Sequence, residues 1–177
     1  MGGNNAIEVC QLNDADATRD LGRRLAERLL AGQGDGTPPL LLLQGDLGAG
    51  KTCLVQGLAE GLGLQEPITS PTFALAHHYP MSPSLTQRPQ AAALVHLDLY
   101  RLDDPVAAAE LFAQEEEEAC ALGAVLAVEW PERLAVQPRP CWLVELREAG
   151  EGREARVSLQ EAPPSGHPQP SSRQARP

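Results

Sequence analysis

A glycine-rich segment at residues 45–52 has the residue types and spacing that phosphate binding requires. It reads Gly-Asp-Leu-Gly-Ala-Gly-Lys-Thr and fits the pattern G-x-x-x-x-G-K-T. In that pattern the glycines let backbone N–H groups curl around phosphate oxygens, and the N-terminus of the following helix adds positive potential. Lys51 is expected to reach the β- and γ-phosphates, and the Thr52 hydroxyl to be one ligand of Mg²⁺. The segment therefore predicts a site for MgATP.

The composition of the chain sets Lys51 apart. It is the only lysine among the 14 basic residues, and all the others are arginines. A compact ammonium on a flexible stem suits a position that must reach phosphate oxygens. This ammonium is expected to be solvated without ligand, so Lys51→Ala should abolish nucleotide use and leave the fold intact. Asp46 would oppose phosphate if it pointed inward, so its side chain is expected to face outward.

Two carboxylates are candidates for the metal and for catalysis. Asp98 ends the run Ala-Leu-Val-His-Leu-Asp, and Glu129 ends the run Ala-Val-Leu-Ala-Val-Glu. If both runs are parallel strands, both acids reach the same sheet edge as the glycine loop. One would hold Mg²⁺ and the other would orient water, and the sequence leaves open which does which. An acid that merely caps a loop after a strand is the alternative for either.

Other polar residues near these motifs have both a functional and a structural interpretation. Thr69, Ser70 and Thr72 form either a switch that contacts the γ-phosphate or its metal, or a capped turn. Arg101 and Arg133 follow the two acids, and either neutralise phosphate charge or pair with surface acids.

Histidines and one tryptophan are weaker candidates. His96 is either a supporting residue behind Asp98 or a core histidine, whereas His77 and His78 should point to opposite faces of a strand and so cannot share a metal. Trp130 either lines the nucleotide site, anchors a partner protein or packs in the core. The glutamate run at 115–118 is expected to be a solvated helix face.

Periodicity and turn residues predict the elements that position these groups. Strands alternating with helices indicate an α/β fold with a mostly parallel sheet, and the last two strands suggest an antiparallel hairpin at one edge. Residues 80–90 are expected to form a polar surface loop. The predicted helices cover residues 13–31, 51–62 and 105–121, and the predicted strands or extended runs cover 40–43, 73–79, 91–97, 123–128, 141–146 and 155–159.

Length, charge and cysteine content limit the function further. A chain of 177 residues suits one domain, assigned to residues 1–161, followed by a disordered Pro/Ser-rich tail at 162–177. The formal charge of -10 disfavours direct binding to DNA or tRNA. No apolar run spans a membrane and no Cys-x-x-Cys pair suggests zinc, so a cytoplasmic protein is expected.

Four segments together resemble the TsaE family, the ATPases of bacterial tRNA threonylcarbamoyladenosine synthesis. They are residues 45–52, Ser-Pro-Thr-Phe at 70–73, His-Leu-Asp-Leu-Tyr-Arg-Leu at 96–102 and Val-Glu-Trp-Pro-Glu-Arg at 128–133. The similarity covers about residues 8–160, whereas the 80–90 loop is longer than is typical and the tail has no family counterpart. The resemblance implies a P-loop NTPase-like three-layer sandwich that hydrolyses ATP and acts with the proteins TsaD and TsaB, which hold the tRNA.

The resemblance also implies a set of site residues. Catalysis would involve Lys51, Asp98 and Glu129, and Mg²⁺ would be held by Thr52, Asp98 and Glu129. The residues expected to bind the nucleotide are Thr18, Asp46, Leu47, Gly48, Ala49, Gly50, Lys51, Thr52, Cys53, Thr72, Trp130 and Arg133.

Two other classes of function compete with this interpretation. A small phosphotransferase, or kinase, shares the glycine loop but usually needs a lid with several phosphate-binding arginines, and only Arg101 lies between Asp98 and Glu129. A binding module would retain ATP without turnover. A GTPase is disfavoured because the guanine-reading Asn-Lys-x-Asp motif needs a lysine other than Lys51.

Overall fold

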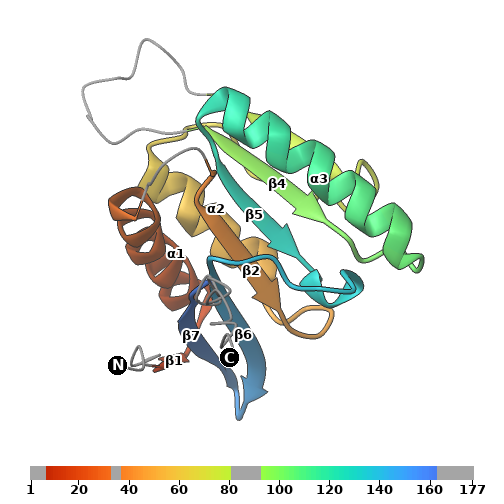
Figure 1. The fold of residues 1–177 in the computed structure, drawn as a ribbon. Coiled ribbons are helices and arrows are strands. Elements are labelled where there is room, and N and C mark those ends of the chain that lie inside the picture. The colour runs from red at the N-terminus through yellow and green to blue at the C-terminus, as the bar shows by residue number, and fades with distance from the viewer. Residues whose placement is uncertain (1–6, 33–36, 81–92, 163–177) are drawn as a thin grey trace, which may run out of the picture.

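The computed structural model describes residues 7–32, 37–80 and 93–162. Within these residues the chain forms one mixed sheet of seven strands in the order β1-β7-β6-β2-β5-β4-β3, with helices on both faces (Figure 1). The strands are β1 (Glu8–Leu12), β2 (Leu40–Gln44), β3 (Ala76–Tyr79), β4 (Leu94–Asp98), β5 (Val125–Glu129), β6 (Cys141–Ala149) and β7 (Gly152–Gln160).

The centre of the sheet is parallel. Strand β2 pairs in parallel with both β5 and β6, and β4 pairs in parallel with β5. The register places Asp98 beside Glu129 and Leu43 beside Glu129. The two carboxylates therefore lie together at the edge of the sheet from which the chain leaves β2 toward the glycine loop.

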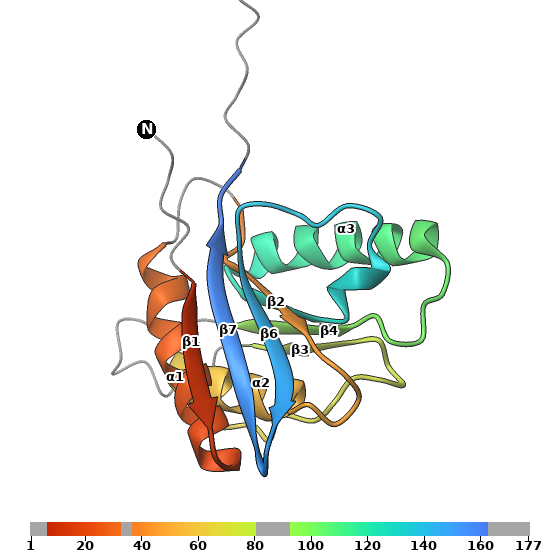
Figure 2. The same ribbon diagram turned by 90° about the horizontal axis from the view of Figure 1, so that it is seen from below.

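Antiparallel strands flank the parallel centre on both sides (Figure 2). Strand β6 pairs with β7 along its whole length, and β1 pairs with the far side of β7. Strand β3 pairs with β4 at the opposite edge. The sequence did not predict β1. This strand forms the edge of the sheet next to the β6–β7 hairpin.

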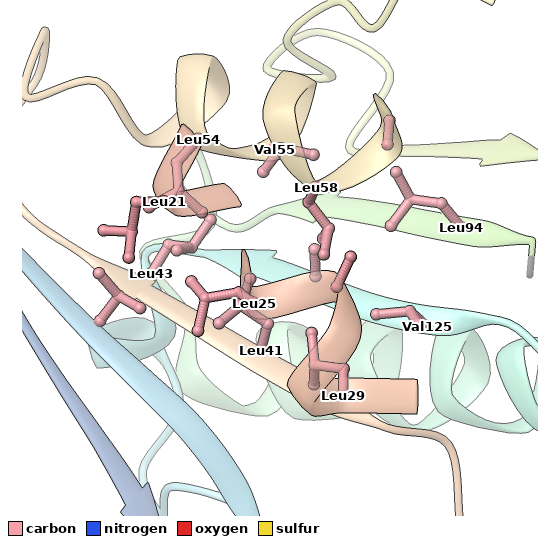
Figure 3. Close-up of a cluster of buried hydrophobic side chains, with 14 of the residues drawn as sticks. Leu21, Leu25, Leu29, Leu41, Leu43, Leu54, Val55, Leu58, Leu94 and Val125 are labelled. Atoms are coloured by element: carbon pink, nitrogen blue, oxygen red, sulfur yellow. The ribbon is translucent and has the colours of Figure 1, made fainter. Parts of the chain in front are cut away.

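Alternate leucines of β2 build the core on both faces of the sheet. Leu41 and Leu43 pack under helices α1 (Ala15–Ala31) and α2 (Lys51–Leu62), and Figure 3 shows them among Leu25 and Leu58 of those helices. Leu40 and Leu42 belong to the second cluster, under α3 (Pro105–Leu122). A strand buried on both faces has the continuous apolar run that the sequence shows there.

The start of α1 is fixed by a side-chain cap. Oδ1 of Asp14 accepts a hydrogen bond from the backbone N–H of Ala17 at 2.8 Å, as expected for a helix N-cap. Asp14 therefore fixes where α1 begins.

Two glycines let α1 and α2 approach closely. A Cβ added to Gly57 would lie 2.0 Å from the backbone oxygen of Arg19, and one added to Gly22 would lie 2.3 Å from that of Leu54. Contacts this short with backbone atoms can be relieved only by moving a helix. Glycine at both positions therefore holds α1, and with it Thr18, against the start of α2.

We expect Gly57→Ala to destabilise the protein by about 1–3 kcal/mol or more, because it overpacks the helix interface. Thermal unfolding should detect a fall of roughly 2–4 °C for each kcal/mol lost. Gly32→Ala is the matched control, since its added Cβ would come no closer than 3.5 Å to the backbone oxygen of Arg28 and φ there is -93°. Equal melting temperatures for wild type and Gly57→Ala would contradict this account of the helix pair.

Glu115 differs from its expected place on a solvated helix face. Its exposed fraction is 5%, and its Oε2 lies 2.6 Å from Nε2 of His78 on β3. It shares the inner face of α3 with Ala108, Phe112 and Ala119. The expectation was therefore wrong for Glu115, which turns inward because its position follows the buried periodicity of the helix.

Two of the predicted features lie outside the part of the chain that is described. They are the 80–90 loop, apart from Pro80, and the tail from residue 163 onward. Among the described residues, no helix combines the length and the apolar character needed to cross a membrane.

Candidate functional site

The glycine loop connects β2 to α2 and has a backbone conformation that favours glycine. Gly45, Gly48 and Gly50 all have positive φ, of 147°, 81° and 102°. At Gly45 an added Cβ would also lie 2.6 Å from the backbone oxygen of Leu146. Glycine is needed here because other residues rarely adopt this conformation and because β6 leaves no room for a side chain.

Lys51 lies inside this loop rather than in solvent. Its exposed fraction is 4%, and Nζ donates hydrogen bonds to the backbone oxygens of Gly45 at 2.6 Å and Asp46 at 2.9 Å. Nζ also lies 4.1 Å from the ring centroid of Trp130. Burial lowers the pKa of Lys51 from its ordinary value of 10.5. The expectation of a solvated ammonium was therefore wrong, and the ammonium already points at the inside of the loop.

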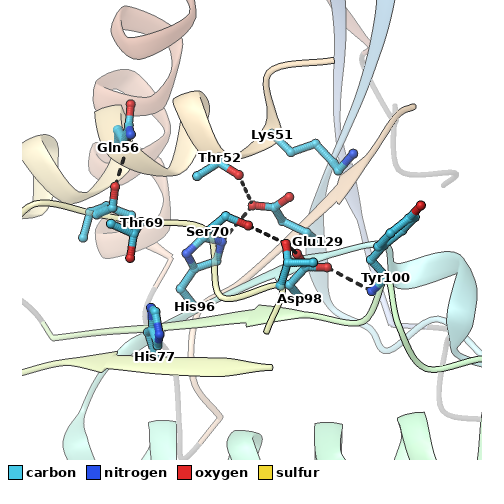
Figure 4. Close-up of polar contacts among 12 residues, drawn as sticks. Lys51, Thr52, Gln56, Thr69, Ser70, His77, His96, Asp98, Tyr100 and Glu129 are labelled. Carbon is cyan, nitrogen blue, oxygen red and sulfur yellow. Dashed lines mark hydrogen bonds and ion pairs between the residues drawn. The ribbon is translucent and has the colours of Figure 1, made fainter. Parts of the chain in front are cut away.

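A cavity of about 210 Å³ opens beside Lys51 and Thr52. Figure 4 shows the polar side chains of this region converging from the glycine loop, the Ser70 turn and the ends of β4 and β5. The cavity is lined by Leu47, Gly48, Gly50, Lys51, Thr52, Cys53, Ser70, Thr72, Asp98, Tyr100, Glu129 and Trp130.

Glu129 is buried at the end of β5 and is tied to the start of α2. Its exposed fraction is 3%, and Oε1 accepts a hydrogen bond from the hydroxyl of Thr52 at 2.8 Å. Nε2 of His96 lies 2.9 Å from the same oxygen. Of the two interpretations of His96, the structure supports a buried histidine that contacts a site carboxylate, although this carboxylate is Glu129 and not Asp98.

Asp98 is buried at the end of β4 and is tied to a different segment. Its exposed fraction is 2%, Oδ2 accepts from the Thr72 hydroxyl at 2.6 Å, and Oδ1 accepts from the backbone N–H of Tyr100 at 2.9 Å. The Ser70 hydroxyl lies 2.6 Å from that of Thr72. Thus Ser70 and Thr72 reach the cavity, whereas Thr69 only donates its backbone N–H to the Tyr79 hydroxyl at 3.4 Å.

A turn delivers Thr72 to Asp98. The backbone N–H of Leu75 donates to the oxygen of Pro71, and Leu75 has a positive φ of 70°. Residues 71–75 are therefore folded back, and the strand begins only at Ala76. The extended run predicted for residues 73–79 was wrong in its first part, because this turn anchors Thr72 beside the end of β4.

A second cavity, of about 250 Å³, lies against the same loop and borders the start of α1. Thr18 lines it and is buried, and its hydroxyl donates to the backbone oxygen of Asp14 at 3.0 Å. Gly48, Gly50 and Cys53 line both cavities, and Ala49 lines only the second. Lys51 thus lines the first cavity and Thr18 the second, and the glycine loop separates the two.

The structure adds two residues that sequence reasoning did not propose. Tyr100 lines the first cavity, and its ring centroid lies 4.9 Å from that of Trp130. Arg153, at the start of β7, lines the second cavity, and its Nη2 lies 3.4 Å from the backbone oxygen of Gly48. Tyr100 sits two residues after Asp98, which was a usable signal, but only the fold brings Arg153 to the loop.

Three of the proposed residues take up different positions from the rest. Arg133 donates to Asp103 at 2.7 Å and to the backbone oxygen of Tyr100 at 3.1 Å, and it lines neither cavity. Arg101 stacks on Phe73, its guanidinium carbon 4.3 Å from the ring centroid. Asp46 exposes its side chain as expected. Arg133 therefore pairs with a surface acid, one of the two roles considered for it.

The donor set around the first cavity fits a hard cation bound together with an anion. Thr52, Asp98 and Glu129 offer only oxygen atoms, which Mg²⁺ prefers, and the buried ammonium of Lys51 offers positive charge for phosphate. Within the described residues, no cluster of three or more His, Cys, Asp or Glu side chains could hold a metal by itself. Such an ion would take its other ligands from phosphate and water, as Mg²⁺ usually does.

Comparisons with known proteins agree on one family. The family model described as "Threonylcarbamoyl adenosine biosynthesis protein TsaE" matches residues 12–156. Proteins named "tRNA threonylcarbamoyladenosine biosynthesis protein TsaE" are 43% identical over 129 residues in Synechocystis sp., covering 72% of each chain, and 38% identical over 151 residues in Nostoc sp., covering 83% of each.

A solved structure, "Crystal structure of Bacillus subtilus YdiB", shares the fold. It aligns with a TM-score of 0.59, covering 89% of this chain and 88% of that one. Its sequence identity of 23% makes this a likeness of fold alone.

Proposed function

The chain belongs to the TsaE family of threonylcarbamoyl adenosine biosynthesis proteins, and from that premise we propose that it binds and hydrolyses MgATP for tRNA modification. Its fold would then be a P-loop NTPase-like three-layer sandwich, and it would work in the cytoplasm with the other proteins of the pathway. The observation that carries the proposal is the hydrogen bond from Thr52 to Glu129, made inside the cavity that also holds Lys51 and Asp98.

The glycine loop and Lys51 would hold the phosphates. The positive φ values of its glycines would let backbone N–H groups of the loop turn toward an anion. The start of α2 adds the positive end of a helix dipole. Lys51 would exchange its bonds to the oxygens of Gly45 and Asp46 for bonds to the β- and γ-phosphates. Because Nζ already lies beside the loop, a short movement of Nζ would be enough to reach a bound nucleotide.

We assign different roles to the two carboxylates from their different partners. Glu129 shares a hydrogen bond with Thr52, so these two residues would hold Mg²⁺, whose charge supplies stabilisation of the transferring phosphoryl group. Asp98 accepts a hydrogen bond from the hydroxyl of Thr72, so it would couple the Ser70–Thr72 turn to the γ-phosphate. Asp98 would also orient the attacking water. This assignment separates two roles that the sequence left open.

The second cavity would take the nucleoside, with Thr18 against it. Trp130 would close the first cavity beside Lys51, whereas Arg133 would act only through its contact with Tyr100. The partners we propose are TsaD and TsaB, with tRNA bound by that pair. A chain of net charge -10 is suited to act on a protein complex and to leave the nucleic acid to others.

Phosphate release from MgATP tests the proposal. We expect slow release by the purified chain, faster release when TsaD and TsaB are added, and none above background for Lys51→Ala. If every mixture stays at background while the TsaD and TsaB pair is shown to be active, the ATPase function is wrong. Transfer of the γ-phosphate to a small molecule, with no free phosphate, would instead identify a phosphotransferase.

A further inference from the structure

A buried histidine lies behind the proposed metal site, within hydrogen-bond distance of Glu129. His96 has an exposed fraction of 0% and lies in the middle of β4, beside the small residue Ala127 of β5. That small neighbour leaves space for the imidazole to reach along the sheet to Glu129, two residues further on. Nε2 then lies 2.9 Å from Oε1 of Glu129 (Figure 4).

The contact fixes where the imidazole proton sits. An ionised carboxylate only accepts hydrogen bonds, so Nε2 of His96 must be the donor. Nδ1 is buried and has no hydrogen-bond partner among the described residues. A proton there would be a buried donor without a partner, which costs more than a bare ring nitrogen does. The contacts of the ring therefore favour the tautomer with its proton on Nε2.

The same contact orients the carboxylate. Oε1 of Glu129 receives two donors, the Thr52 hydroxyl at 2.8 Å and His96 at 2.9 Å, which approach from α2 and from β4. Within the described part of the chain no hydrogen bond reaches Oε2. Two donors on one oxygen hold the plane of the carboxylate and leave the second oxygen available to the cavity.

We propose that His96 is a positioning residue that aims Glu129 at the Mg²⁺ site through its Nε2–H. This inference rests on the proposed function, because it concerns the same metal. Hydrogen-bond partners behind a metal ligand typically change metal affinity on the order of 10–100-fold when they are removed. His96 should therefore control the metal dependence of nucleotide binding more than nucleotide binding itself.

Calorimetry with ADP, in Mg²⁺ and again in EDTA, tests the proposal. For His96→Leu we expect the Kd of ADP in Mg²⁺ to rise on the order of 10–100-fold and the Kd in EDTA to change little. His96→Gln keeps a donor near the position of Nε2 and should restore most of the Mg²⁺ effect. His77→Leu is the matched control, since His77 is the register partner of His96 on β3 and does not contact Glu129.

The outcomes separate this inference from the proposed function. Equal losses of affinity in Mg²⁺ and in EDTA for His96→Leu, or failure of His96→Gln to restore the Mg²⁺ effect, would overturn the positioning role. Wild-type protein that binds no ADP in either buffer would instead overturn the proposed function.

A spectroscopic measurement covers the case in which His96→Leu does not fold. Nitrogen NMR of the wild-type imidazoles should show one ring with its proton on Nε2, assigned by its loss in His96→Gln. The chain has 4 histidines, so the assignment is tractable. A proton found on Nδ1 of that ring would contradict the proposal without any need for the leucine variant.

Discussion

Lys51→Ala is expected to reduce MgATP hydrolysis about 100-fold or more and to leave the melting temperature of the ligand-free protein close to that of wild type. The loss follows because one preorganised donor aimed at developing charge is typically worth ~10²–10³ in rate. The retained stability follows from burial. The pKa of Lys51 is lowered by desolvation, so removal of the ammonium relieves a cost of burial that offsets the loss of its hydrogen bonds to Gly45 and Asp46.

Two further variants separate charge from packing. Lys51→Met keeps most of the apolar stem, removes the ammonium that lies over the Trp130 ring, and should lose hydrolysis to the same extent. Arg24→Met removes an exposed positive charge on α1 and should keep wild-type hydrolysis. Phosphate release and thermal unfolding are measured on all of them. A Lys51→Met protein with near wild-type hydrolysis would show that the ammonium does not contact phosphate.

Local sequence was sufficient to predict those parts of the candidate site that lie within a single strand, loop or helix. The segment from 45 to 52 predicted a glycine loop between a buried strand and a helix, and the structure places it between β2 and α2. The two apolar runs ending at Asp98 and Glu129 predicted parallel strands, and their register sets the two acids side by side. These inferences succeeded because parallel strands bring their carboxyl ends to one edge.

Contacts between segments far apart in the chain could not be predicted from local sequence. The Thr72–Asp98 bond depends on the positive φ of Leu75, a conformation for which leucine gives no signal. Arg153 reaches Gly48 only because the β6–β7 hairpin ends near the loop. The strand at Glu8–Leu12 is exposed at alternate positions, so it lacks the continuous apolar run that marked β2.

Glu115 shows a failure that the sequence could have prevented. Four consecutive glutamates were interpreted as one solvated face, yet consecutive residues on a helix point in different directions. Spacings of four, three and four connect the buried positions Ala108, Phe112, Glu115 and Ala119 of α3. Extending the apolar periodicity through the acidic run would have placed Glu115 inward, where it meets His78.

Glu129→Gln is expected to abolish the Mg²⁺ enhancement of ADP binding and to lower MgATP hydrolysis about 100-fold or more, because a bound metal supplies several kcal/mol to phosphoryl transfer. The substitution keeps the size of the side chain and replaces one carboxylate oxygen with an amide nitrogen. That nitrogen either faces the donors Thr52 and His96, which both need an acceptor, or faces the metal. Either orientation damages the arrangement observed at Oε1.

Asp98→Asn provides the comparison that decides between the two acids. Because Asp98 is tied to Thr72 and to the backbone of Tyr100, this variant should slow hydrolysis yet keep the Mg²⁺ enhancement of ADP binding. Glu117→Gln, an exposed change on α3, should alter neither quantity. If Asp98→Asn loses the Mg²⁺ effect while Glu129→Gln keeps it, the roles are exchanged and Asp98 is the metal ligand. The hydrogen bond between Thr52 and Glu129 would then serve only to hold the start of α2 against the end of β5.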